Sequence, residues 1–173
     1  MSLAQDLLNE LTQEAAVTRR YLASVPFDKA AFQPHEKSET LGRLTIHIAE
    51  IIAWWKECIL NKELNFIDFE PADISSTAAL LSYFDTLLVE AKSVLQQAKD
   101  SDLENGTWSM RYGDIVYFTL PKKQALRIFC MNHLVHHRAQ LGVYLRLLDI
   151  PVPAVYGPSA DDDNVLLVAP FPV

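Results

Sequence analysis

The sequence contains little cysteine, with only Cys58 and Cys130 among 173 residues. Two cysteines cannot build the disulfide framework that stabilises many small secreted domains. The first residues also lack the basic and apolar regions of a secretory signal peptide. Both absences favour a cytoplasmic protein.

Basic residues are outnumbered by acidic ones. The 15 Lys and Arg against 22 Asp and Glu give a formal net charge of −7. Proteins that bind nucleic acid or anionic lipid rely on clustered Lys and Arg, because phosphates attract cations. The sequence has no such cluster, and it has no apolar run of the roughly 18 residues that a membrane-spanning helix needs. We therefore expect a small-molecule substrate and no nucleic-acid or membrane partner.

Glycine is also scarce, at five residues. None of them belongs to a phosphate-binding loop or to the sharp turn that presents a nucleophilic serine in many hydrolases. Half of the residues are hydrophobic, so that a sizeable core is available. A chain of this length fits one domain, and we expect a single domain over residues 1–173.

Four stretches carry apolar residues at steps of three and four, the spacing that marks the buried side of an amphipathic helix. They cover residues 3–24, 39–60, 77–99 and 121–148. The predicted fold class is therefore all-α, a four-helix bundle. The connection over residues 61–75 is long for neighbouring antiparallel helices, and it predicts that the second and third helices run parallel or cross diagonally.

Residues 102–120 lack the helical period. Their pattern predicts a short strand, a turn at Gly113 and Asp114, and a second strand. Because an isolated hairpin is only marginally stable, this excursion must pack against the helices. Pro121 is expected in the first turn of the last helix, where the backbone needs no N–H donor.

Three of the five histidines lie together in the last predicted helix. His133 and His137 are four residues apart, which places both rings on one helix face, with Cβ atoms roughly 5–6 Å apart. Two imidazoles at this spacing can bind one divalent metal ion. The glutamate that follows the first histidine in helical metalloproteases is replaced by Leu134, so the spacing indicates a metal but not that reaction. His136 points about 100° away from His137.

Both His133 and His137 fall on the apolar stripe of their helix and are expected to point inward. The alternative to a metal site is a pair of hydrogen-bonded core histidines, because a buried neutral imidazole needs polar partners. His47 lies on or beside the apolar stripe of the helix over 39–60, from which it can supply a third nitrogen. Three protein ligands with open coordination positions are typical of a catalytic metal centre.

The segments that carry these histidines resemble the two histidine motifs of the DinB-like family. Residues 33–50, which include His47, resemble the first motif. Residues 132–141 resemble the second, His-x-x-x-His-Arg-Gly-Gln, with Ala139 where the family commonly has Gly. Residues 151–161 resemble the tail of one subgroup, so that the resemblance spans nearly the whole chain.

The resemblance implies an up-down-down-up four-helix bundle with a three-histidine divalent metal site, often in a homodimer. Family members with assigned activity include thiol-dependent transferases and isomerases that use bacillithiol, mycothiol or glutathione. Many others are described only as metal-dependent hydrolases, so the reaction stays open. The metal stays open as well, because imidazole binds Zn²⁺, Ni²⁺, Fe²⁺ and Mn²⁺.

Three further polar residues are candidate catalytic groups. Glu50 lies three residues after His47 on the same side of its helix, where it can act as a general base or hold a ligand histidine. A solvated glutamate is the alternative. Gln140 lies seven residues after His133 on the same face and can orient a ligand or a substrate. Tyr144 can do likewise or simply pack.

Four other residues have competing interpretations. Cys130 lies one turn before His133 and is a conceivable fourth ligand, although a small core residue explains it better. Arg138 is expected to face outward, into a salt bridge or a dimer contact. Trp54 and Trp55 are adjacent, so one is expected in the core and the other at a pocket or a subunit contact.

The leading hypothesis is a metal-dependent enzyme, either a hydrolase or a thiol S-transferase. A second is a non-catalytic metal-binding or stress-response protein, in which the three histidines only join two helices. A third is a metal-free bundle that functions by dimerising. An open pocket beside the histidines, lined by Trp54 or Trp55 and residues 102–120, would favour the enzyme, and a closed site would favour the structural role.

Overall fold

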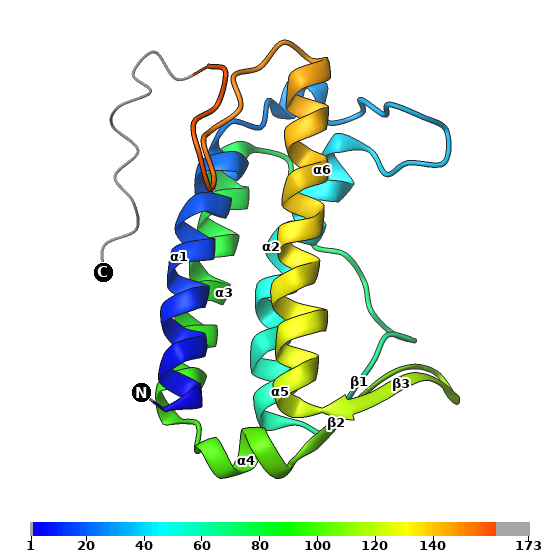
Figure 1. Cartoon of the computed structure of the whole chain (residues 1–173). Helices are drawn as coiled ribbons and strands as arrows, with labels where there is room; N and C mark the ends of the chain where they lie inside the picture. The colour runs from blue at the N-terminus through cyan, green and yellow to red at the C-terminus, as the bar shows by residue number, and fades with distance from the viewer. Residues whose placement is uncertain (1, 162–173) are drawn as a thin grey trace.

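The computed structural model describes residues 2–161, and its main body is a bundle of four long helices (Figure 1). The first three are α1 (Leu3–Ala23), α2 (Leu41–Leu60) and α3 (Thr77–Gln97). The fourth consists of three consecutive segments, α5 (Lys122–Ala125), the π-helical η2 (Leu126–Asn132) and α6 (His133–Leu147). The predicted fold class is confirmed, and the four predicted helices end within two residues of these bounds.

Polar side chains define where the first three long helices begin. Ser2, Thr40 and Ser76 each accept a hydrogen bond from the backbone N–H three residues further along. Such a cap satisfies one of the N–H groups that the first helical turn leaves unpaired. Between α1 and α2 the chain forms only the short 3₁₀ helix η1 (Phe27–Lys29).

The helices run up-down-down-up (Figure 1). Residues 61–76 carry the chain back along the bundle, so α3 starts at the same end as α2 and runs parallel to it. Each helix packs against two others: α1 and α2 both contact α3 and α6. The long connection predicted to make the second and third helices parallel therefore has that effect.

The core is centred on α2, which buries most of its length. Trp55 is fully buried and Trp54 is 5 % exposed, so the prediction that one of the two leaves the core is wrong. Trp54 stacks on Phe129 of η2, with ring centroids 4.6 Å apart, and contacts Phe66. Because α2 lies between α3, α6 and the residues after α2, adjacent side chains on different faces of the helix are both covered.

A small sheet lies at one end of the bundle (Figure 1). Its strands β2 (Thr107–Tyr112) and β3 (Ile115–Pro121) form the predicted antiparallel hairpin. Gly113 opens the two-residue turn with φ 57°, a conformation that favours glycine. The third strand, β1 (Glu63–Asn65), pairs parallel with β2 and was not predicted, because three residues are too few to show a period.

The start of the fourth helix differs from the prediction. Pro121 is the last residue of β3 and precedes α5, rather than lying in the first helical turn. Lys122 follows, and its ammonium donates to the Ile59 carbonyl near the end of α2, at 2.6 Å. A further short helix, α4 (Asp100–Asn105), lies before the hairpin. The hydrogen bond from Lys122 to Ile59 joins the start of the fourth helix, next to the sheet, to the end of α2.

Arg138 does not face outward as predicted. Its side chain is buried, and its Nη1 lies 2.7 Å from a Glu14 carboxylate oxygen on α1. It also donates to the Tyr156 hydroxyl, at 2.8 Å. Arg138 lies on the side of α6 that packs against α1, and its buried guanidinium is stabilised by the paired Glu14 carboxylate.

Within residues 2–161, no helix is long and apolar enough to cross a membrane. Asp161 at the end of this range forms an ion pair with Arg146 of α6. The remaining residues, 162–173, lie outside the described residues, and the single domain expected over residues 1–173 stays a prediction.

Candidate metal centre and adjoining pocket

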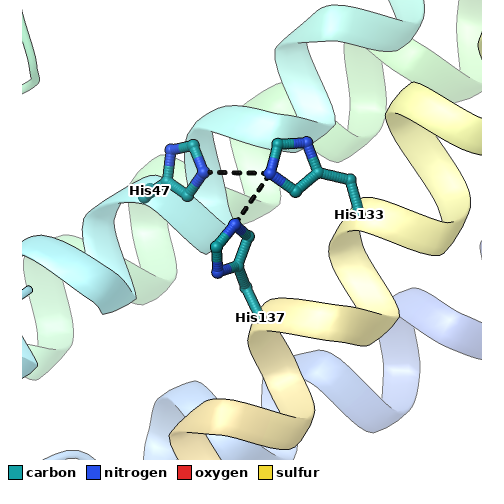
Figure 2. Close-up of side chains that lie close together, drawn as sticks. All are labelled: His47, His133 and His137. Carbon is teal, nitrogen blue, oxygen red and sulfur yellow. Dashed lines mark hydrogen bonds between the residues drawn. The ribbon is translucent and has the colours of Figure 1, made fainter. Parts of the chain in front are cut away.

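Three histidines from two helices meet beside the core (Figure 2). His47 comes from α2, and His133 and His137 come from consecutive turns of α6. The Nε2 atoms of His47 and His133 are 3.4 Å apart, and those of His133 and His137 are 2.7 Å apart. The predicted convergence of the three histidines is confirmed.

The donor set fits a divalent metal ion. Three nitrogens bound to one Zn²⁺ at about 2.0–2.1 Å in tetrahedral geometry lie roughly 3.3–3.4 Å from one another. The separation between His47 and His133 matches this value. The 2.7 Å separation between His133 and His137 is that of an N–H···N hydrogen bond, so these two rings would have to separate by roughly 0.6 Å.

The second ring nitrogens of His47 and His137 face polar side chains. Nδ1 of His137 lies 2.7 Å from Oε1 of Gln140, and since an amide oxygen can only accept, the imidazole donates. That hydrogen bond places the lone pair of His137 on Nε2, the nitrogen that faces the His133 ring. Nδ1 of His47 lies 3.9 Å from Oε2 of Glu50, an electrostatic contact rather than a hydrogen bond.

Glu50 is a buried member of the site rather than a solvated helix residue, with 2 % exposure. Its carboxylate accepts hydrogen bonds from Arg43, at 2.9 Å, and from the backbone N–H of Ala72, at 3.0 Å. Burial raises the pKa of Glu50, but interactions with His47, Ala72 and Arg43 outweigh it and hold the pKa below its ordinary value. Glu50 is therefore ionised at neutral pH and places a negative charge behind His47.

The histidines that α6 contributes to the cluster, His133 and His137, are neutral at physiological pH. Burial lowers the pKa of His133 to about 4, and the neighbouring His137 and His47 contribute in the same direction. Burial also lowers the pKa of His137 to about 4, against the hydrogen bond to Gln140, which raises it. Neutral imidazoles are the form that binds a metal, so metal binding at neutral pH does not have to compete with an imidazolium.

Aromatic rings close one side of the histidine cluster. The Trp54 ring lies 5.4 Å from the ring of His47 and 5.3 Å from that of His133, measured between centroids. Phe129, which stacks on Trp54, lies 5.8 Å from His133. Trp54 thus covers one side of the histidines, and it does not line the pocket described next.

A pocket of about 410 Å³ opens on the other side of the cluster. Its walls come from the loop before α2, the start of α2 and the middle of α6. The lining residues include Lys37, Glu39, Arg43, Leu44, Gln140 and Tyr144, next to His47 and His137. Residues 102–120, whose presence in a pocket wall would have favoured an enzyme, do not contribute to this pocket.

Two of the predicted catalytic residues line this pocket and the third does not. Gln140 is exposed and bound to His137, while the Tyr144 hydroxyl donates to the Glu39 carbonyl at 2.9 Å. Glu50 lies behind His47, outside the pocket walls. The sequence prediction missed Arg43, although its position seven residues before Glu50 places both on one helix face.

Cys130 takes no part in the cluster. It is fully buried, and its Sγ lies 3.7 Å from Sγ of Cys58. Burial raises the pKa of the Cys130 thiol well above its ordinary value, which makes it a poor ligand. The interpretation of Cys130 as a core residue is confirmed. His136 is exposed and outside the cluster, as its position on the helix predicted.

Comparisons with known proteins agree with this fold. A model of the DinB family matches residues 1–164. The curated "Uncharacterized protein YrdA" of Bacillus subtilis is 23 % identical over 149 residues, which cover 86 % of this chain and 85 % of that protein. The crystal structure of the DinB-like protein YjoA from Bacillus subtilis superposes with a TM-score of 0.67 at 18 % identity, covering 87 % of this chain and 96 % of that one.

A second crystal structure, of a DinB-like protein from Bacillus cereus ATCC 10987, has a TM-score of 0.66 at 24 % identity. It covers 88 % of this chain and 97 % of the other. At these identities the two structures support the fold, whereas the chemistry has to be argued from the residues described above.

Proposed function

The chain belongs to the DinB family, and from this premise we propose that it is a metal-dependent enzyme acting on a small molecule. His47, His133 and His137 would hold one divalent ion through Nε2. The observation that carries the proposal is the convergence of three Nε2 atoms at the edge of an open pocket. Three protein ligands leave room for a substrate in the coordination sphere, as in catalytic zinc sites.

The residues around the histidines position them. Glu50 is fixed by Arg43 and the Ala72 backbone and places its carboxylate behind His47. Gln140 fixes the ring of His137 so that Nε2 faces its partners. Partners of this kind set the tautomer and orientation of a ligand histidine. We therefore assign Glu50 and Gln140 as positioning residues and Tyr144 as a pocket wall.

The proposed reaction class is thiol S-transfer, with hydrolysis as the second candidate. A divalent metal supplies Lewis acidity, which stabilises an anionic thiolate or oxygen nucleophile at neutral pH. The pocket leads directly to His47 and His137, so a low-molecular-weight thiol can reach the site from solvent. Three imidazoles accept Zn²⁺, Ni²⁺, Fe²⁺ or Mn²⁺, and metal supply in the cell decides among them.

A metal that only joins α2 to α6 is the main rival proposal. Such a structural site is normally closed by four protein ligands. Among residues 2–161, the histidine cluster gathers three ligand groups, and a pocket of about 410 Å³ adjoins it. This combination favours catalysis over a purely structural role.

The test is metal analysis of protein purified without added metal, followed by a screen of thiols with electrophiles and of hydrolase substrates. We expect one metal ion per chain, and turnover that His47→Ala, His133→Ala and His137→Ala each abolish. A protein that binds metal with no turnover in any assay would support the structural role. Turnover that survives all three substitutions would refute the proposal.

We further propose that the protein is a cytoplasmic homodimer with no nucleic-acid or membrane partner. The buried thiols of Cys58 and Cys130 remain free and suit a reducing compartment. The homodimer rests on the family resemblance alone, because both tryptophans that suggested a subunit contact are buried.

A further inference from the structure

Two cationic side chains line the pocket beside the histidines. Arg43 lies one helical turn before His47 on the same face of α2, and Lys37 lies on the loop that precedes this helix. The other charged residue at the pocket wall is Glu39, which is exposed. The wall therefore carries two cationic side chains, Lys37 and Arg43, and one carboxylate, Glu39.

Arg43 is held in a fixed position with hydrogen-bonding capacity to spare. Its Nη1 donates to Oε2 of the buried Glu50, which also accepts from the Ala72 backbone. Its Nε and Nη2 make no hydrogen bond within residues 2–161, and its side chain is 27 % exposed. The two unused N–H groups of a guanidinium held in this way can donate a pair of parallel hydrogen bonds to a carboxylate or a phosphate.

The loop that carries Lys37 is held by its own hydrogen bonds. The Lys37 backbone N–H donates to Nδ1 of His35, at 3.1 Å, and the Gln33 side chain donates to the Ser38 carbonyl. On the opposite wall, the Tyr144 hydroxyl donates to the Glu39 carbonyl and ties the loop to α6. The Lys37 ammonium itself forms no ion pair within residues 2–161.

We propose that this pocket selects small molecules that carry an oxyanion, a carboxylate or a phosphate, at the end opposite their metal-binding group. The free N–H donors of Arg43 bind the oxyanion, and the Lys37 ammonium adds electrostatic attraction. The inference rests on the proposed function, because it places the other end of the substrate at the histidines. A volume of about 410 Å³ suits a ligand of metabolite size.

The test compares three thiols that differ at the far end: 3-mercaptopropionate, its uncharged amide 3-mercaptopropionamide, and 2-mercaptoethyl phosphate. NMR titrations of the full chain, loaded with zinc and metal-free, give the dissociation constants. We expect at least one anionic thiol to bind zinc-loaded protein about tenfold or more tightly than the amide, as for hydrogen bonds to a charged group. The stronger of the two anions identifies the preferred oxyanion.

Matched variants assign the effect to the two cations. Arg43→Gln should reduce the preference for the anion about tenfold. Arg43→Lys, which keeps the charge but loses the fork, should reduce it less. Lys37→Gln should reduce it by about two- to fivefold, as for an exposed charge. Lys123→Gln, which removes an exposed cation outside the pocket, should leave it unchanged.

The two thiol titrations, with and without zinc, distinguish failure of the metal-dependent function from failure of the anion site. If the wild-type protein binds none of Zn²⁺, Ni²⁺, Fe²⁺ and Mn²⁺, the metal-dependent function fails, yet the ratio of anion to amide affinity in metal-free protein still reports on Arg43 and Lys37. Equal affinity for the amide and both anions in zinc-loaded protein overturns the anion site. An equal loss of preference in Lys123→Gln and Arg43→Gln also overturns it, because the attraction would then be a general effect of charge.

Discussion

At the scale of single residues, the site depends on which nitrogen of each histidine is free. Gln140 accepts the proton of His137 Nδ1, and the Glu50 carboxylate faces Nδ1 of His47. Each interaction directs Nε2 toward the centre of the cluster. The capacity of these histidines to bind a metal therefore depends on Gln140 and Glu50, which orient the rings, as well as on the spacing of the histidines.

Removing one histidine should separate the ligand role from a packing role. We expect His137→Ala to lower the metal content and to abolish most of the metal-dependent rise in melting temperature, since metal that binds only the folded protein stabilises it by mass action. The matched control is His136→Ala, one residue earlier and exposed, which should change neither quantity. Differential scanning calorimetry with and without Zn²⁺ gives both shifts. A loss in His136→Ala as large as in His137→Ala would contradict the assignment.

The metal-free protein should lose stability as the pH falls from about 6.5 to about 4. In the unfolded chain, His133 and His137 take up protons near 6.5, whereas burial in the folded chain holds both pKa values at about 4. The unfolded state binds more protons in this window, so the free energy of unfolding decreases with falling pH. Urea unfolding in the presence of a chelator measures the slope.

The control for this pH dependence is a double variant, His133→Asn with His137→Asn. Carboxylates that titrate in the same window contribute equally to both proteins. We expect a shallower slope for the double variant between pH 6.5 and 4. Identical slopes would mean that the two histidines are not held neutral in the folded state.

The sequence revealed part of this site and not the rest. The pair His133 and His137 was predictable because four residues of one helix fix its geometry. His47 could be proposed as a partner, but its distance depends on the packing of α2 against α6. The contact between Ala72 and Glu50 joins residues 22 apart through an irregular connection, and no local pattern predicts it.

At the scale of elements, the fourth helix is less regular than its apolar stripe suggested. The π-helical η2 directly precedes His133, and Met131, Leu134 and Arg138 are buried beside the predicted stripe. Segments of this kind often occur at functional sites. A π-helical turn contains one more residue than an α-helical turn, and the spacing of apolar residues in a sequence does not reveal it. A regular α-helix was therefore predicted over the whole segment.

Lys122 links two elements and offers a test of that link. Its ammonium donates to the Ile59 carbonyl near the C-terminus of α2, and burial lowers its pKa. Lys122→Met should reduce the free energy of unfolding by about 1–3 kcal/mol, because a carbonyl loses a charged donor. Lys123→Met, at an exposed neighbouring position, should change it by less than about 0.5 kcal/mol. Chemical denaturation gives the free energy of unfolding of both variants. Equal losses in the two would contradict a specific link between Lys122 and Ile59.

At the scale of the whole molecule, the bundle brings distant segments to one place. The up-down-down-up order makes α2 and α6 neighbours, and the connection after α2 returns past the site to supply the Ala72 amide. The length of one connection predicted that α2 and α3 run parallel or cross diagonally, and the complete helix order was implied by the family resemblance. The pocket was not, because the loop before α2 forms its wall and the expected hairpin does not.

The oligomeric state is a prediction at this scale. We expect a homodimer, so light scattering should give twice the 19.5 kDa mass of one chain at micromolar concentration. A dilution series distinguishes a stable dimer from a weak one. A single 19.5 kDa species across the micromolar range would contradict the prediction.

The most direct test of the central claim is a crystal structure of the protein loaded with a divalent metal, with anomalous diffraction measured at the absorption edge of that metal. We predict one anomalous peak per chain, about 2.0–2.2 Å from Nε2 of His47, His133 and His137, with an open side toward the pocket of Arg43. A peak bound by His136, or no peak between α2 and α6, would contradict the three-histidine metal centre and the catalytic proposal with it.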